Sequence, residues 1–205
     1  AVYMIALPWL MLELTGSKSL TSIVTTSAYL PAVLFGLTAG VVVDRYDRKK
    51  IMIYSDIFRA ILALMISVSI IFGFITPLLI GCTTFLLSSF ATFFYPARDS
   101  LIPHITTPEE LPIANSAISI SGQMSHLLGP FFAGIGISII GLKHLFTVDA
   151  VSFLFSILAI SLIIMPLSRK EPRPPTSQLN GILEGLSYVN SNKGLKALLF
   201  ITFIN

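Results

Sequence analysis

The most suggestive side chains for chemistry in this sequence are polar groups inside long apolar stretches. Asn115, Ser119, Gln123 and His126 follow one another at spacings of four, four and three residues, which places them on one face of a helix. Polar groups in a bilayer are costly unless they face a partner or water, so this face predicts a cavity that receives a solute. His126 fits two interpretations, a neutral hydrogen-bonded core residue or a group that titrates near physiological pH.

A preceding apolar stretch carries hydroxyls and aromatic rings. Phe85, Ser89 and Thr92, with Ser88 and Phe93 beside them, could form the wall of a site for a bulky apolar substrate. Helix hydroxyls also commonly bond to the backbone of their own helix. Both interpretations of these side chains stay open at this stage.

Acidic residues inside or at the ends of apolar stretches are the candidates for carrying a proton. Asp149 and Glu13 are the two that fit. Asp149 has no cation close by in the sequence other than Lys143, six residues before it, and Glu13 lies at the outer end of the first helix. Asp56 and Arg59 are three residues apart on one predicted helix. That spacing favours a structural ion pair between them.

Enzyme motifs are missing from the sequence. No His-Glu pair has the spacing of a metal site, no Gly-x-Ser-x-Gly elbow occurs, and no Ser-His pairing is evident. Cys82 is a lone cysteine, which excludes a disulfide framework and a cysteine-based metal centre. We therefore expect no catalytic residue, no metal, no cofactor and no enzymatic activity.

Composition identifies the kind of element that must hold these residues. The chain has 205 residues, of which 54% are hydrophobic and 11% charged, and its mean hydropathy is +0.86. Soluble domains carry roughly 25% charged residues, so a soluble enzyme, a nucleic-acid binder and a disordered chain are all excluded. The sequence predicts an all-α polytopic membrane protein.

Apolar stretches of about 20 residues mark the membrane-spanning helices. Residues 20–43 form one span, and residues 60–97 contain 38 residues without a charge, which is too many for a single crossing. The segment Gly73 to Pro77 divides that stretch into two helices. Residues 111–142 form the next span, and residues 150–168, begun near Leu145, form the last complete one.

The two ends of the sequence fit incomplete helices. Residues 1–13 are apolar but too short to cross a bilayer, and we interpret them as the second half of a first helix. We expect a six-helix bundle over residues 1–167, a cytoplasmic linker over residues 168–194, and the start of a seventh helix over residues 195–205.

The positive charges predict the orientation in the membrane. Eleven of the 13 Lys and Arg residues fall on one side of the predicted spans, and only Lys18 and Lys143 fall on the other. Because short loops rich in Lys and Arg stay in the cytoplasm, we expect the N-terminus and the linker to be cytoplasmic. The chain is therefore expected to be a multi-pass protein of the plasma membrane.

The densest polar motif is the segment from Gly40 to Lys50, between the second and third spans. It resembles the signature loop of the major facilitator superfamily, which reads Gly, three residues, Asp, Arg, any residue, Gly, Arg, and then Lys or Arg. The matching residues are Gly40, Asp44, Arg45, Arg48 and Lys49. Asp47 stands where most members have Gly, a departure similar to the bacterial exporters of drugs, macrolides and siderophores.

The resemblance continues along nearly the whole chain, through Pro96-Ala97-Arg98, Gly129-Pro130 and Val148-Asp149-Ala150. It implies a transporter of twelve helices in two halves, of which this chain is the N-terminal half, with the macrolide-efflux permeases as the closest pattern. The location that this resemblance implies is the bacterial inner membrane. In that scheme Asp44, held among Arg45, Arg48 and Lys49, forms a cytoplasmic latch with the other half.

Small residues recur every four positions on two of the predicted spans. Such stripes let helix backbones approach closely in lipid. They could pack inside this half, but in the resembled fold these two helices slide against the other half. The stripes are Ala28, Ala32, Gly36 and Gly40, and Ser121, Ser125, Gly129 and Ala133. Pro130 predicts a kink beside the second stripe.

The predicted function is proton-coupled export of a lipophilic or amphipathic small molecule by alternating access. The expected partners are the bilayer, the substrate, protons and the C-terminal half of the transporter, with no nucleic acid. Uptake of a nutrient or flipping of a lysolipid would use the same scaffold, and a non-transporting membrane scaffold is the alternative from another class.

Overall fold

The computed structural model describes residues 3–164, and every regular element in that range is a helix. The predicted linker 168–194 and the predicted helix start 195–205 lie outside the described residues. The elements in chain order are α1 (Tyr3–Thr15), α2 (Lys18–Ser27), α3 (Leu30–Arg45), α4 (Arg48–Ile71), α5 (Pro77–Ile105) and α6 (Leu111–Leu162).

Four helical stretches are long and apolar enough to cross a membrane, and α1 is apolar but shorter. The four are Lys18–Arg45, Arg48–Ile71, Pro77–Ile105 and Leu111–Leu162. They agree with the predicted polytopic architecture, although their boundaries divide the chain differently from the predicted spans at two places.

The first difference lies in the span predicted over residues 20–43, which is two helices, α2 and α3. The helical pattern is interrupted at Ala28 and Tyr29, where the Ala32 backbone N–H donates to the Tyr29 carbonyl at 3.2 Å. Pro31 explains the interruption, because proline has no N–H to donate to the preceding turn.

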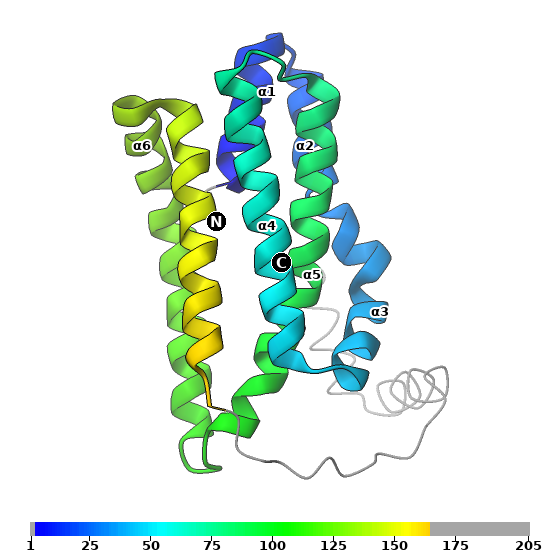
Figure 1. Cartoon of the computed structure of the whole chain (residues 1–205), viewed down its shortest axis with the longest axis vertical. Coiled ribbons are helices and arrows are strands. Elements are labelled where there is room, and N and C mark those ends of the chain that lie inside the picture. The colour runs from blue at the N-terminus through cyan, green and yellow to red at the C-terminus, as the bar shows by residue number, and fades with distance from the viewer. Residues whose placement is uncertain (1–2, 165–205) are drawn as a thin grey trace, which may run out of the picture. The chain divides into compact units, whose positions relative to one another are not determined.

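The second difference is α6, which joins the two last predicted spans in one element of 52 residues. A straight helix of that length would measure about 78 Å, more than twice the apolar core of a bilayer. Gly141 interrupts it with φ 75° and ψ 163°, a conformation that favours glycine. Figure 1 shows the chain reversing near this point, which gives α6 a first arm (111–140) and a second arm (142–162).

The C-terminal end of α6 also differs from the sequence prediction. The helix ends at Leu162 and not at the predicted Ser168, with Ile163 in an extended conformation.

At the turn between the arms, a Cβ on Gly136 would stand 2.7 Å from Leu145 Cδ1. Glycine at position 136 therefore permits the close approach of the two arms.

Polar side chains cap the N-termini of α2, α4 and α5. The side chains of Ser17, Asp47 and Thr76 accept hydrogen bonds from backbone N–H groups three residues later, at 3.3, 3.1 and 3.2 Å. Each cap satisfies a donor that the first helical turn leaves without a partner. The break predicted between residues 73 and 77 lies between α4 and α5, where Gly73 has φ +74°.

α4 lies at the centre of the bundle, between α5 and the second arm of α6 (Figure 1). Its buried face shares one apolar core with α1, α2, α5 and α6. The largest fully buried side chains of this core are Leu7, Met11, Ile66, Ile80, Leu87 and Phe146. A smaller core forms near the start of α4, from Val43, Met52, Ala97, Leu101 and Ile160.

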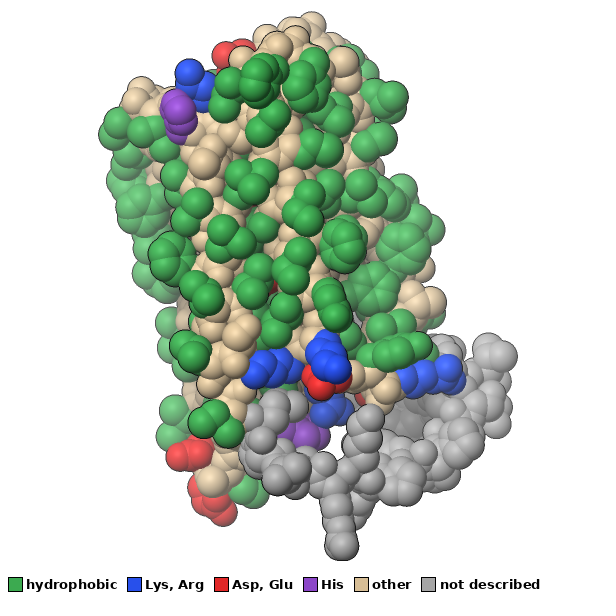
Figure 2. Space-filling model, in the orientation of Figure 1, with side chains coloured by type: hydrophobic (Ala, Val, Ile, Leu, Met, Phe, Trp, Pro, Cys, Tyr) green, Lys and Arg blue, Asp and Glu red, His purple; other side chains and the backbone are tan. Residues whose placement is uncertain are grey.

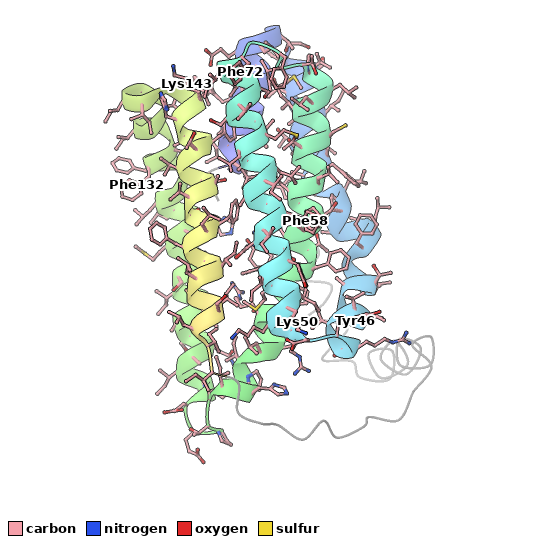
Figure 3. All side chains as sticks on the ribbon, in the orientation of Figure 1. Tyr46, Lys50, Phe58, Phe72, Phe132 and Lys143 are labelled. Atoms are coloured by element: carbon pink, nitrogen blue, oxygen red, sulfur yellow. The ribbon has the colours of Figure 1, made fainter. Side chains whose placement is uncertain are left out.

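The surface has an apolar belt between two more polar ends. Figure 2 shows hydrophobic side chains over the middle of the visible face, with Lys, Arg and acidic side chains gathered toward the two ends. Figure 3 places Lys143 near Phe72 at one end and Lys50 near Tyr46 at the other. This distribution suits a bundle whose belt faces lipid.

Candidate functional site

Most charged side chains of the α3–α4 loop and the first turn of α4 bind to the ends of helices. Asp47 is the N-cap of α4, and the Lys49 Nζ donates to the carbonyls of Ser161 and Ile163, at 2.8 Å each. A cation at the C-terminus of a helix satisfies carbonyls and interacts favourably with the helix dipole. Lys49 thereby ties the start of α4 to the end of α6.

Arg48 uses its charge on the end of α5. Its Nη1 lies 2.8 Å from His104 Nε2, in the last turn of α5. The contact requires an imidazole nitrogen with a lone pair, because a guanidinium only donates hydrogen bonds. The loop therefore holds together the ends of three helices.

Asp44 is placed differently from these loop residues. It lies in the last turn of α3 with an exposed side chain, and within residues 3–164 it has no ion pair. Arg45 beside it is also exposed. Arg48 and Lys49 were expected to hold Asp44. Instead, Arg48 contacts His104 and Lys49 contacts the end of α6.

A buried ion pair occupies the middle of the bundle. Asp56 is 0% exposed and Arg59 is 5% exposed, and their side chains are hydrogen bonded to each other. Ser156 Oγ in the second arm of α6 donates to Asp56 Oδ2 at 2.6 Å. Both carboxylate oxygens of Asp56 therefore have donors, which is the condition for a stable buried charge.

Aromatic rings enclose the guanidinium of Arg59. Its Cζ lies 4.5 Å from the centroid of the Phe94 ring and 4.7 Å from that of Phe153. A cation over an aromatic face is attracted by the ring quadrupole, and more strongly when it is removed from water. Arg59 Nε is nevertheless buried with no hydrogen-bond partner among the described residues.

Asp149 and Glu13, the two predicted proton carriers, have opposite environments. Asp149 is 7% exposed, and its Oδ2 is buried with no hydrogen-bond partner in the described part of the chain. Glu13 is exposed near the end of α1. A buried carboxylate oxygen without a donor is costly when the acid is charged.

The predicted polar face lies on the first arm of α6 and is exposed. Asn115, Ser119, Gln123 and His126 all have exposed side chains. His126 alone of the four borders a cavity of about 220 Å³, which α1, α2, α5 and α6 enclose with Tyr29. The cavity is lined by Met4, Ile5, Pro8, Thr25, Ala28, Tyr29, Thr84, Ser125, His126 and Pro130.

The hydroxyls of α5 are bonded within their own helix. Ser89 Oγ donates to the Phe85 carbonyl at 2.8 Å, and Thr92 Oγ1 donates to the Ser88 carbonyl at 2.9 Å. Phe35 of α3 packs between Phe85 and Phe93, with centroid distances of 6.2 and 6.4 Å. Phe85, Ser89 and Thr92 do not line the cavity at His126.

The small-residue stripes lie mostly at the surface of the described bundle. Ala32, Gly36, Ser121 and Ser125 are exposed, whereas Ala133 is fully buried. A Cβ on Gly36 or Gly40 would meet no atom within 4 Å. Most of the stripe positions are thus not used for packing inside residues 3–164.

Sequence reasoning missed several partners at these sites. Asp149, Phe153 and Ser156 are spaced by four and three residues, a helical-face signal that was available in the sequence. The partners of Lys49 and Arg48 had no such signal, because they lie on other helices.

No group of three or more His, Cys, Asp or Glu residues within residues 3–164 could hold a metal.

Comparison with known proteins identifies similar sequences. Residues 1–204 match a family described as transmembrane secretion effector. The chain is 25% identical to macrolide efflux protein A of Streptococcus pyogenes over 202 residues, which is 98% of this chain and 50% of that protein. It is 28% identical to the multidrug efflux pump Tap of Mycolicibacterium fortuitum over 212 residues, covering 99% of this chain and 51% of the pump.

A third relative is an uncharacterized MFS-type transporter, YkuC of Bacillus subtilis, at 30% identity over 201 residues, with 93% of this chain and 46% of that protein covered. The chain thus spans about half the length of the curated relatives it matches. No solved structure shows a significant match.

Proposed function

The chain belongs to the transmembrane secretion effector family of the major facilitator superfamily, and from that premise we propose that it is the N-terminal half of a multi-pass secondary exporter. The proposed transporter moves a lipophilic or amphipathic small molecule, such as a drug, macrolide or siderophore, out of a bacterial cell. It carries out no enzymatic reaction, and protons moving inward drive the export by alternating access.

One observation carries this proposal. The first arm of α6 has exposed side chains on its polar face, and positions 36 and 40 of α3 have open space where a Cβ would stand. An exposed polar face is costly in lipid, and small residues at fourfold spacing suit close helix packing. A second helical half covering these faces accounts for both.

The two stripes are then the surface against which the other half slides, and the predicted kink at Pro130 lies beside it. The predicted substrate path is the space between the halves, bordered by Asn115, Ser119, Gln123 and His126. The cavity at His126 belongs to that path, and its apolar lining with a few polar groups suits an amphipathic cargo. Asp149 and Glu13 are the proposed proton carriers.

The cytoplasmic latch is the proposed control of the conformational change. Asp44 is exposed and has no ion pair within residues 3–164, so it is accessible to a charged or polar group of the other half. A contact made in only one of the two conformations would shift their populations. The N-terminus and the linker lie on the same, cytoplasmic side in this scheme.

Transport by the complete exporter tests the proposal. Everted membrane vesicles containing it should accumulate a radiolabelled macrolide or ethidium against a gradient, and a protonophore should abolish the accumulation. Asp44→Asn should remove most of this transport while the protein still inserts. Asp99→Asn is the matched control, since Asp99 is also exposed near the same membrane end but pairs with Arg98; wild-type rates from Asp44→Asn would remove the latch.

A further inference from the structure

Asp56, Arg59 and Asp149 form one column of buried charge between α4 and the second arm of α6. The column consists of two carboxylates and one guanidinium, with side chains that are 0%, 5% and 7% exposed. Arg59 is hydrogen bonded to Asp56, and it also attracts the Asp149 carboxylate electrostatically. The three side chains are therefore one interacting group.

Helix geometry places Arg59 between the two acids. Asp149, Phe153 and Ser156 follow at spacings of four and three, so they lie on one face of the second arm, each about one turn, or 5.4 Å, from the next. The guanidinium lies over the Phe153 ring. Asp149 is one turn to one side of that ring, and Ser156, which holds Asp56, is one turn to the other side.

Two buried atoms without hydrogen-bond partners in the described residues fit each other chemically. Arg59 Nε is a donor and Asp149 Oδ2 is an acceptor. Buried polar atoms without partners are rare and costly. A guanidinium that moved one turn toward Asp149 would satisfy this acceptor, at the cost of its contact with Asp56.

The charges of the column do not balance when both acids are ionised. Two carboxylates and one guanidinium sum to −1, and a net charge is strongly disfavoured in a low-dielectric interior. Among the described residues, the Tyr3 hydroxyl of α1 is the other ionisable group that faces Arg59 and Asp149, and a tyrosine hydroxyl is neutral at physiological pH. One bound proton makes the column neutral.

We propose that Asp149 is the proton-binding site of the transporter and that Arg59 is a mobile counter-charge shared between Asp149 and Asp56. This inference rests on the proposed function and specifies the site of its coupling ion. With a proton on Asp149, Arg59 pairs with Asp56, which is the arrangement in the structure. Loss of that proton leaves a carboxylate that draws Arg59 toward it and away from Asp56.

The exchange links the proton to the contact between α4 and α6. In the protonated form, Arg59 and Ser156 together fix Asp56 between the two helices. In the deprotonated form the guanidinium pairs with Asp149, and Asp56 keeps only the Ser156 hydroxyl. The contact between α4 and the second arm therefore has a different strength in the two forms, so protonation shifts the balance of conformations.

Infrared difference spectroscopy of the purified full-length transporter tests the site without any transport. Raising the pH should remove the band of a protonated carboxyl from the wild type, and Asp149→Asn should lack this band. Asp99→Asn is the matched control and should retain it. The same band in Asp149→Asn would overturn the proposal.

Transport by the same variants in proteoliposomes tests the role of the proton. With ethidium as the probe, Asp149→Asn should lose uptake driven by a pH gradient while keeping exchange of labelled for unlabelled ethidium, because Asn imitates the protonated acid. Loss of exchange as well would indicate a structural role and would count against the proposal.

A second variant and a second comparison complete the test. Asp149→Glu keeps an ionisable group and should retain gradient-driven transport with a shifted pH profile, even if Asp149→Asn folds poorly; an unshifted profile would contradict the proposal. If the wild type shows the carboxyl band but transports no probe, the proposed function fails and the proton site stands.

Discussion

The two arms of α6 are both largely apolar helices, but they have opposite relations to the rest of the bundle. The second arm (142–162) packs on α4 and contributes buried residues, including Phe146, Asp149 and Ala150. The first arm (111–140) contributes only Ala133 to the fully buried set of the described chain. One arm is thus part of the core, and the other is attached to it at few points.

Polar residues distinguish the two arms more sharply than apolar ones do. In the second arm, Thr147 and Ser156 bond to Ser67 and Asp56 on α4. In the first arm, Ser116 and Ser138 bond to their own helix. The comparison teaches that hydroxyls of the second arm join it to α4, whereas the hydroxyls of Ser116 and Ser138 in the first arm bond only within that arm.

The largest expected effect comes from removing Arg59, the cation at the contact between α4 and the second arm. Arg59→Ala leaves Asp56 and Asp149 buried without a counter-charge, and we expect a loss of about 3–5 kcal/mol in the free energy of unfolding. Thermal unfolding of the detergent-purified protein measures it. Arg45→Ala, at the exposed end of α3, should change stability by less than about 0.5 kcal/mol; equal effects would mean that the buried column is not a stabilising unit.

The turn that separates the arms gives the next largest effect. Gly141→Ala puts a side chain at φ 75° and ψ 163°, and we expect a destabilisation of up to about 3 kcal/mol. Gly122→Ala is the control, because Gly122 has open space around it and a helical backbone. This control should be neutral or slightly stabilising, and a stable Gly141→Ala would show that the turn tolerates an alternative geometry.

The attachment of the first arm predicts a smaller effect at one position. Ala133→Leu adds volume to a fully buried site, and we expect a loss of about 1–2 kcal/mol. Ala117→Leu introduces the same change at an exposed position of the same arm and should leave stability unchanged. A similar loss in both variants would show that position 117 is also packed.

The smallest effect comes from removing a single hydroxyl group. Ser67 Oγ lies 2.7 Å from both the Lys143 carbonyl and Thr147 Oγ1 of the second arm, and Ser67→Ala should cost about 0.6 kcal/mol. Ser116→Ala removes a hydroxyl that bonds within the first arm and should cost less. Denaturant unfolding of both variants would reveal the reverse order if the comparison were wrong.

Sequence predicted those parts of the fold that depend on local signals. The break at Gly73 and the reversal at Gly141 follow from glycine conformation, and the apolar stretches follow from hydropathy. The division of the span 20–43 was missed, although Pro31 was visible, because a proline near the middle of an apolar run can also be tolerated in a membrane helix.

The contacts of the charged residues were harder to predict than their positions. Ser156 lies 100 residues from Asp56, and Ser161 lies 112 residues from Lys49, so no local spacing connects them. The pairing of Asp56 with Arg59 was predictable because it spans only three residues. The position of Asp44 near the end of α3 was predictable. The contacts of Arg48 and Lys49 with other helices were not.

The threonines around the cavity have a consequence for selectivity. Thr25 and Thr84 both donate their hydroxyl hydrogens to carbonyls of their own helices, at 2.9 and 2.8 Å. Only the oxygen lone pairs of these side chains remain for a visiting molecule. If the proposed cargo enters this cavity, the threonine part of the lining would favour compounds that bring their own N–H or O–H groups over compounds that present only ethers and carbonyls.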